Sequence, residues 1–249
     1  MEAYAHLSKM YDYLMDDVDY NQWVDYLDNF IKKHYSNAER ILELACGTGN
    51  ITRGLAQKGY RVDAVDISDE MLTIAQDKLA NNLGKVRFIQ SDMLELDLND
   101  KYDVVLCLCD GINYITDLAD VDKLFSNIQS LVKENALFIF DISSEHKLSN
   151  HLGNHTFAEN YEEFSYIWEN YFDVDERILE FDFTIFQKDG ELFRKFHEYH
   201  VQRAHRVEEL NYLLKKNNFG NIKVYHEMTL RKFVDESERI HFVSINGGK

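Results

Sequence analysis

The stretch Glu43-Leu-Ala-Cys-Gly-Thr-Gly-Asn50 decides the fold, because it is a glycine turn that carries an acid and follows the apolar pair Ile41-Leu42. The apolar residues are typical of the end of a buried strand, and the glycines let the backbone turn sharply beside a ligand. Residues 51–57 have the pattern of a helix. Strand, loop and helix in this order predict a nucleotide-type binding loop, although a glycine pair alone is weak evidence.

A second strand ends in an acid at Tyr60-Arg-Val-Asp-Ala-Val-Asp66. Asp66 follows the glycines by about 20 residues, the distance at which such folds bind a ribose diol. The alternative is that Asp66 caps the next helix. Ser68 is the better N-cap, because Asp69 and Glu70 would then lie in the first helical turn, where the dipole favours acids. Asp66 is therefore predicted to bind a ligand.

Glu43 separates two kinds of cofactor. A dinucleotide loop brings a pyrophosphate to the helix N-terminus, where an acid would repel it, whereas a cationic ligand would be attracted. The third glycine of the dinucleotide fingerprint, counted from Gly47, would stand at position 52, which is Thr. An NAD(P)-dependent oxidoreductase is therefore an alternative rather than the first hypothesis.

These residues resemble the motifs of class I S-adenosylmethionine-dependent methyltransferases, in particular those of a small bacterial group described only as methyltransferases. The cofactor of that family has a ribose, an adenine, a sulfonium and an ammonium, which suit a loop with acids and small residues. The resemblance implies an α/β, Rossmann-like, doubly wound fold. Its sheet would be mostly parallel and seven-stranded, with a C-terminal antiparallel hairpin.

The resemblance also implies a set of cofactor-binding positions. The set is Tyr11, Glu43, Ala45, Gly47, Gly49, Asp66, Ile67, Met71, Asp92, Met93 and Cys109. Ala45 replaces the first glycine of the family motif. Asp92 would accept a hydrogen bond from the adenine amino group, and the next backbone amide would bind the ring. Tyr11, near the cofactor carboxylate, and Ile67 and Met71, beside the adenine, could equally be core residues.

Further strands are predicted at residues 86–90, 103–109 and 136–142, with a helix over 121–132 that Asp120 would cap. Alternating strands and helices imply a parallel sheet with right-handed crossovers. Ligands of such sheets bind at the carboxyl ends of the strands. The candidate ligand-binding acids Glu43, Asp66 and Asp92 lie at such ends.

After residue 142 the pattern changes to the aromatic-rich segments 164–172, 178–187 and 192–201. The last two are joined by Lys188-Asp-Gly190, and an Asp-Gly pair is a hairpin signal. The pattern predicts a small antiparallel β insert.

We expect a single methyltransferase domain over residues 1–249, because no linker or repeat divides the chain. Residues 1–35 would form an N-terminal helical cap. Residues 36–146 and 205–249 would form the Rossmann-like core. Residues 147–204 would form the insert, as a lid over the methyl acceptor.

The insert also carries the best candidate for a general base. Residues 198, 200 and 202 share one face if they lie on a strand, and His200 can accept a proton near neutral pH with Glu198 beside it. An exposed polar face would have the same pattern. The segment Asp110-Gly-Ile-Asn-Tyr114 resembles the family's loop beside the acceptor. The predicted catalytic residues are His200 and Asp110, and the predicted acceptor-pocket residues are Asn113, Tyr114 and Arg203.

Composition limits the classes of partner. The 249 residues are 45% hydrophobic and 29% charged, as in globular proteins. The 27 Lys and Arg against 44 Asp and Glu give a net charge of −17, which disfavours a nucleic acid substrate. A local patch, Arg194, Lys195, Arg203 and Arg206, could still face one, but acids are interleaved with it.

The three cysteines, Cys46, Cys107 and Cys109, fit neither a disulfide framework nor a zinc spacing. They indicate a reducing compartment. The first thirty residues hold seven acids and no apolar signal segment, and no run approaches 18 apolar residues, so we expect a cytoplasmic protein without a membrane span. The ten histidines form no metal-binding pattern, and we expect no metal.

The predicted function is transfer of a methyl group from S-adenosylmethionine to an N or O atom of a small-molecule acceptor, which releases S-adenosylhomocysteine. The protein would align, desolvate and, where needed, deprotonate the acceptor for an in-line displacement. A non-catalytic module that binds S-adenosylmethionine or S-adenosylhomocysteine is the alternative from another class. A protein acceptor or partner stays open.

Overall fold

The structure is a computed structural model that describes residues 7–16, 18–80 and 83–247, and it contains two sheets. The larger sheet has seven strands in the order β10-β11-β5-β4-β1-β2-β3. Its strands are β1 (Arg40–Leu44), β2 (Arg61–Asp66), β3 (Val86–Gln90), β4 (Tyr102–Cys107), β5 (Val132–Ser143), β10 (Phe219–His226) and β11 (Arg239–Asn246).

Strands β1 to β5 of this sheet are parallel, and β11 pairs antiparallel with both β5 and β10. The central strands are buried on both faces, as parallel strands covered by helices must be. Leu42 and Leu44 pack into one apolar cluster, whereas Ile41 packs into the other, on the opposite face. This arrangement confirms the predicted doubly wound fold with its C-terminal antiparallel pair.

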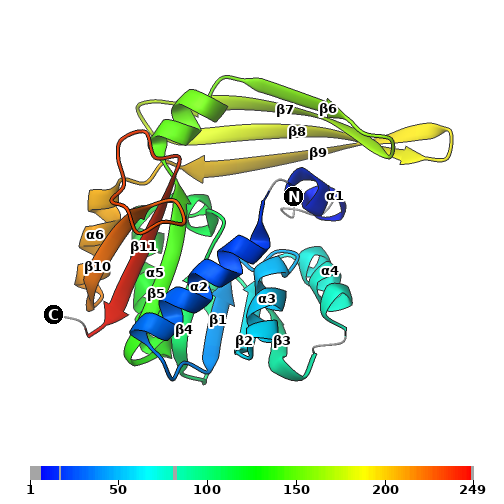
Figure 1. The fold of residues 1–249 in the computed structure, drawn as a ribbon. Helices are drawn as coiled ribbons and strands as arrows, with labels where there is room; N and C mark the ends of the chain where they lie inside the picture. Colours follow the sequence, from blue (N-terminus) through cyan, green and yellow to red (C-terminus); the bar gives the residue numbers. More distant parts are fainter. Residues whose placement is uncertain (1–6, 17, 81–82, 248–249) are drawn as a thin grey trace.

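Helices cover both faces of the larger sheet (Figure 1). One face carries α2 (Tyr20–His34), α3 (Asn50–Lys58) and α4 (Asp69–Leu79), and the other carries α5 (Leu118–Leu131) and α6 (Val207–Lys216). The described residues also form the short helices η1 (Leu83–Lys85), η2 (Met93–Glu95), η3 (Gly111–Tyr114) and η4 (Lys147–Leu152). No helix of the described part is long and apolar enough to cross a membrane.

The start of α5 corrects one prediction. The helix begins at Leu118 rather than at residue 121, and its N-cap is Asp117 rather than Asp120. The backbone of Asp117 is extended, and its carboxylate accepts the N–H of Ala119 at 2.8 Å. Asp120 lies in the first turn, where the helix dipole favours an acid.

The predicted insert is the second sheet, which follows β5 in the sequence. It is antiparallel and contains β6 (Thr156–Asn160), β7 (Phe164–Asp173), β8 (Ile178–Asp189) and β9 (Leu192–Arg203). Gly190 lies in the two-residue turn between β8 and β9, in the left-handed region with φ +67°. The hairpin signal is therefore confirmed.

The insert lies across the end of the larger sheet, and α1 (Ser8–Leu14) lies beneath it (Figure 1). Side chains alternate along β8, so that Phe181 and Phe183 are buried and Glu180 is exposed. Met10 of α1 packs into the same apolar cluster as these two aromatic residues. The insert thus has an inner apolar face that is partly covered by α1.

Candidate functional site

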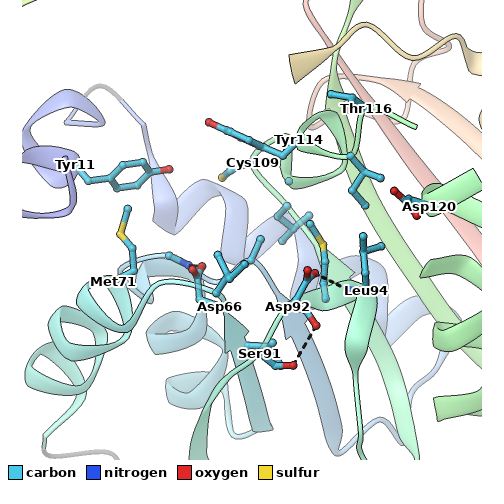
Figure 2. Close-up of a pocket in the computed structure, with 18 residues that line it drawn as sticks. Tyr11, Asp66, Met71, Ser91, Asp92, Leu94, Cys109, Tyr114, Thr116 and Asp120 are labelled. Carbon is cyan, nitrogen blue, oxygen red and sulfur yellow. Dashed lines mark hydrogen bonds between the residues drawn. The ribbon is translucent and has the colours of Figure 1, made fainter. Parts of the chain in front are cut away.

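A cavity of about 340 Å³ lies at the carboxyl ends of the parallel strands, as the strand-end rule predicts (Figure 2). Its lining residues are Tyr11, Ala45, Gly47, Val65, Asp66, Ile67, Met71, Ser91, Asp92, Met93, Leu94, Leu108, Cys109, Gly111, Tyr114, Ile115, Thr116 and Asp120. Every predicted cofactor-binding residue is among them except Glu43, which lines a smaller adjoining cavity, and Gly49, which is the N-cap of α3.

The loop between β1 and α3 contains three left-handed residues, Ala45, Gly47 and Gly49, with φ values of +51°, +54° and +74°. The position of Ala45 therefore favours glycine, because a Cβ costs about 1–2 kcal/mol in this region. At Gly49 space is also limiting, since an added Cβ would lie 2.9 Å from the Cβ of Ala75 in α4. The loop thus turns where it lines the cavity.

Asp66 ends β2, and its carboxylate organises the loop. One oxygen accepts the N–H of Gly47 at 2.8 Å and the other accepts the N–H of Ser68 at 3.0 Å. Ser68 caps α4 by accepting the N–H of Met71, as predicted. Burial raises the pKa of Asp66, and the backbone hydrogen bonds oppose that shift. A carboxylate has about four acceptor sites, which is more than the backbone N–H groups of Gly47, Ile67 and Ser68 fill, so the group can still accept a ribose hydroxyl.

Glu43 is buried, and its Oε2 accepts the hydroxyl of Thr52 at 2.6 Å. Thr52 occupies the position of the third dinucleotide glycine, so the residue that departs from that fingerprint is the partner of Glu43. Burial raises the pKa of Glu43 to about 7, and the nearby charge of Asp66 adds to the shift. A cation bound beside Glu43 would favour its ionised form.

Ile67, Met71 and Asp92 also line the cavity. Ile67 is 59% exposed, which excludes the alternative that it is a core residue. Met71 is buried from solvent but its side chain borders the cavity (Figure 2). Asp92 caps η2, with its Oδ1 accepting the N–H of Leu94 at 2.8 Å, and its other oxygen has capacity for a ligand.

Asp12 connects helix α1 to the glycine loop and to α4. Its carboxylate accepts hydrogen bonds from Thr48 Oγ1 at 2.8 Å and from Asn50 Nδ2 at 3.0 Å, and it pairs with Lys78 Nζ at 2.5 Å. This position carries Tyr11 into both cavities, and burial raises the pKa of its hydroxyl. No spacing in the sequence indicates these long-range contacts of Asp12.

The acceptor candidates meet at Tyr114. Its ring lines the cavity and lies edge-on to the ring of His200, with centroids 6.0 Å apart. His200 Nε2 lies 3.2 Å from Glu198 Oε2, and Glu198 Oε1 accepts the N–H of Leu7 at 2.8 Å. Residues 198, 200 and 202 share one face, as predicted, and this face is buried. The alternative of an exposed polar face is therefore excluded.

Neither Asn113 nor Arg203 is among the lining residues of the cavity within the described chain. The amide of Asn113 donates to the carbonyls of Ser143 and Arg203, and its oxygen accepts the N–H of Ser143. The guanidinium of Arg203 donates to the carbonyl of Thr116, a lining residue. Both side chains therefore hold the segment of residues 113–116 in place through backbone groups.

Asp110 has two partners that the sequence did not suggest. Its Oδ1 pairs with Arg239 Nη2 at 2.9 Å, and its Oδ2 accepts the amide of Gln202 at 2.9 Å. Arg239 also pairs with Asp141, near the end of β5. Asp141 could have been found in the sequence in the same way as Asp66, as an acid near the end of a strand. The contacts of Arg239 could not, because they depend on the pairing of the antiparallel strand β11.

The sequence also missed other lining residues: Val65, Ser91, Leu94, Leu108, Ile115, Thr116 and Asp120. Val65, Ser91, Leu94 and Leu108 lie in or within four residues of a predicted strand end, Ile115 and Thr116 follow the quoted segment 110–114, and Asp120 was assigned to a helix cap. Among the described residues no group of three or more His, Cys, Asp or Glu is arranged to hold a metal ion.

A family model described as a methyltransferase domain matches residues 41–135. A Bacillus subtilis protein named "Putative methyltransferase YqeM" is 34% identical over 240 residues, which cover 96% of this chain and 95% of that protein. The crystal structure of an S-adenosylmethionine-dependent methyltransferase from Clostridium acetobutylicum is 35% identical, with a TM-score of 0.89 over 98% of this chain and 99% of that chain.

A more distant neighbour is S-adenosylmethionine-bound CalS10 from Micromonospora echinaspora, an amino pentose methyltransferase. It is 16% identical, with a TM-score of 0.73 over 94% of each chain. At this identity the likeness shows the fold alone.

Proposed function

This chain belongs to the S-adenosylmethionine-dependent methyltransferases, and we propose that it methylates an N or O atom of a small-molecule acceptor by in-line displacement without a metal. The observation that carries the acceptor proposal is the contact of Tyr114 with His200. It joins the cofactor cavity to a buried histidine and carboxylate on the inner face of the insert.

The described residues fit the cofactor. Asp66 has acceptor capacity for the ribose hydroxyls, and Ile67 is an exposed apolar side chain beside it. Asp92 and the backbone of Met93 suit the adenine amino group and ring, and Glu43 suits the cationic end. The remaining proposed contacts are Tyr11, Ala45, Gly47, Gly49, Met71 and Cys109. When bound, the cofactor supplies an electrophilic methyl group on its sulfonium.

His200 is the proposed general base. A neutral N or O nucleophile must lose a proton around the transfer step, and Glu198 would orient the ring of His200 and stabilise its charged form. Tyr114 would form the wall between the acceptor and the cofactor. Asp110 is the second titratable candidate, but each of its oxygens already has a partner, Arg239 or Gln202.

The proposed roles of the chain segments follow the predicted domain boundaries. Residues 36–146 and 205–249 would hold the cofactor, residues 147–204 would act as the acceptor lid, and residues 1–35 would cap the site. The hydrogen bond from the N–H of Leu7 to Glu198 supports this assignment, because it joins the cap to the insert. Asn113 and Arg203 would shape the acceptor pocket through the segment that they support.

A small acceptor is supported by the net charge of −17, which disfavours nucleic acids. The printed description of CalS10, an amino pentose methyltransferase, is a precedent on the same fold. Transfer of a labelled methyl group to an extract would distinguish a protein acceptor from a small-molecule acceptor. The cytoplasm stays the predicted location, supported by the three free cysteines.

The decisive test is calorimetric titration of the protein with S-adenosylmethionine and S-adenosylhomocysteine, with NADH as the control ligand. We expect one-site micromolar binding of both sulfur compounds and none of NADH. Transfer of a labelled methyl group to low-molecular-weight fractions of an extract would then identify the acceptor class. Binding without transfer to any fraction would favour the non-catalytic module, and heat from NADH alone would favour the oxidoreductase.

A further inference from the structure

Asp141 of β5 holds the backbone of the cavity wall. Its side chain is fully buried, and its two oxygens accept the N–H groups of Cys109 at 2.8 Å and Asp110 at 3.1 Å. Both of those residues are left-handed, with φ values of +54° and +57°. Such a pair of non-glycine residues persists only where the surrounding structure holds it. A buried carboxylate that accepts both N–H groups is such a constraint.

Arg239 connects this carboxylate to the side chain of Asp110. One guanidinium nitrogen donates to Asp141, and the other lies 2.9 Å from Asp110 Oδ1. The guanidinium also stacks over the ring of Trp23 in α2, 5.6 Å from its centroid. A planar, permanently charged fork can hold two carboxylates at once, which a lysine cannot do with the same geometry.

Gln202 reaches the same carboxylate from the insert. Its Nε2 donates to Asp110 Oδ2 at 2.9 Å, and it lies two residues after His200 on the same buried face of β9. The oxygens of Asp110 thus bind one group from the core and one from the insert. The segment that begins at Cys109 continues through Gly111, Tyr114, Ile115 and Thr116, all of which line the cavity.

We propose that Asp141, Arg239 and Gln202 are positioning residues for the cavity wall, residues 109–116. Asp110 is their junction: it ties the wall to the core and to the strand that carries His200. Asp110 therefore works as an anionic anchor and leaves proton transfer to His200. This last point rests on the proposed function, whereas the anchoring of the wall does not.

The chain offers a matched control for Asp141. Asp103 is also a buried carboxylate that accepts two consecutive backbone N–H groups, those of Glu39 at 3.0 Å and Arg40 at 2.9 Å, and it pairs with Lys133. It lies at the amino end of β4, opposite the cavity. Both variants to Asn remove an acceptor oxygen, but only one of them acts on the wall.

The experiment compares Asp141→Asn with Asp103→Asn by calorimetry with S-adenosylhomocysteine and by amide hydrogen exchange. We expect Asp141→Asn to weaken binding at least tenfold and to speed exchange at residues 109 and 110 at least tenfold. Asp103→Asn should lower the thermal midpoint with affinity within twofold of wild type. Equal losses of affinity in both variants would reduce Asp141 to a general stabilising residue and overturn the proposal.

Gln202→Met keeps the proposal testable if Asp141→Asn does not fold. It removes the donor to Asp110 with little change in volume. We expect faster hydrogen exchange at residues 109–116 and 200–202 than in the wild-type protein. Unchanged hydrogen exchange in these segments would contradict the proposal that Asp110 connects the cavity wall to β9. A wild-type protein that binds no S-adenosylhomocysteine would instead contradict the cofactor assignment, and the exchange data would still test the anchoring.

Discussion

The carboxyl ends of β1 and β2 and the inner face of β9 both carry buried acids, but different features of the fold orient them. Glu43 and Asp66 lie at or next to the last residue of a parallel strand, so they point into the crevice where the chain leaves the sheet. Glu198 and His200 lie within a strand, and the pleat and the register with β8 decide which way they face.

The surroundings of the two sets differ in the same way. Asp66 is held by backbone N–H groups of the loop that it serves. His200 stacks on Phe181, with ring centroids 5.2 Å apart, and meets Tyr114 from a distant part of the chain. Local sequence therefore determines the proposed cofactor side, whereas tertiary packing determines the proposed acceptor side. Each prediction below tests one side against the other.

The largest effect is expected on the acceptor side, for His200→Gln. Loss of a general base typically lowers the rate by about 10²–10⁴-fold, or about 3 to 5 kcal/mol in activation free energy.

The matched control is His197→Gln, because His197 lies on the opposite, exposed face and pairs with Asp182 at 2.6 Å. The measurement is kcat with the acceptor that labelled transfer identifies, together with the affinity for S-adenosylhomocysteine. Equal rates in the two variants would remove His200 from catalysis, and a parallel loss of cofactor affinity would contradict the separation of the two sides.

A glycine pair tests the cofactor side at the level of the backbone. Gly49→Val places a branched side chain at φ +74° with its Cβ 2.9 Å from Ala75, and we expect a loss of about 3 kcal/mol in unfolding free energy from strain and overpacking. Binding of S-adenosylhomocysteine should fall at least a hundredfold. Gly190→Val at the insert hairpin has a similar φ of +67° but no atom within 4 Å, so it should cost about 1–2 kcal/mol and leave binding unchanged. Denaturant unfolding and calorimetry measure both. Similar binding losses would mean that the loop geometry of Gly49 has no special role.

Asp66→Ala is expected to have the next largest effect. A hydrogen bond to a charged group contributes about 1.5 to 3 kcal/mol, and the variant also frees the N–H groups of Gly47 and Ser68. The affinity for S-adenosylhomocysteine should fall by that free energy, as measured by calorimetry. Asp182→Ala on the outer face of the insert is the control and should bind normally. Unchanged affinity in Asp66→Ala would exclude the ribose contact.

The same difference between local and long-range contacts explains which features could be predicted from the sequence. The order of strands and helices, the cap at Ser68 and the hairpin at Gly190 follow from local patterns, and the structure has them. The cap of α5 was misplaced by three residues, because Asp117 and Asp120 both precede apolar helical positions and only the extended backbone of Asp117 distinguishes them.

The roles of the acceptor-side residues were harder to predict for a physical reason. Asn113 has the right chemistry for a substrate contact, but both ends of its amide bind backbone groups that lie 30 and 90 residues away in the sequence. Arg239 was not considered, since its partners meet it only through an antiparallel strand added at the edge of a parallel sheet. Contacts of this separation have no local signal.

Glu43→Gln should have the smallest of these effects on affinity and the clearest pH signature. Burial raises the pKa of Glu43 from 4.5 to about 7 in the folded protein. The protonated form therefore stabilises the free protein fully below about pH 4.5, and this stabilisation is lost as the pH rises through about 7. The Gln variant should not show this dependence. Its affinity for S-adenosylmethionine at pH 8 should be about tenfold weaker, or about 1.4 kcal/mol, because the cationic ligand loses a carboxylate.

Proton release makes this prediction specific to the cofactor side. A cationic ligand favours the ionised carboxylate, so binding near pH 7, close to the raised pKa of Glu43, should release a fraction of a proton. Calorimetry in buffers of different ionisation enthalpy measures this number directly. Glu43→Gln should release none, whereas Glu198→Gln, on the acceptor side, should release as much as wild type. Equal release from all three proteins would mean that another group responds to the ligand, and the assignment of Glu43 to the cationic end would then fail even if its variant binds weakly.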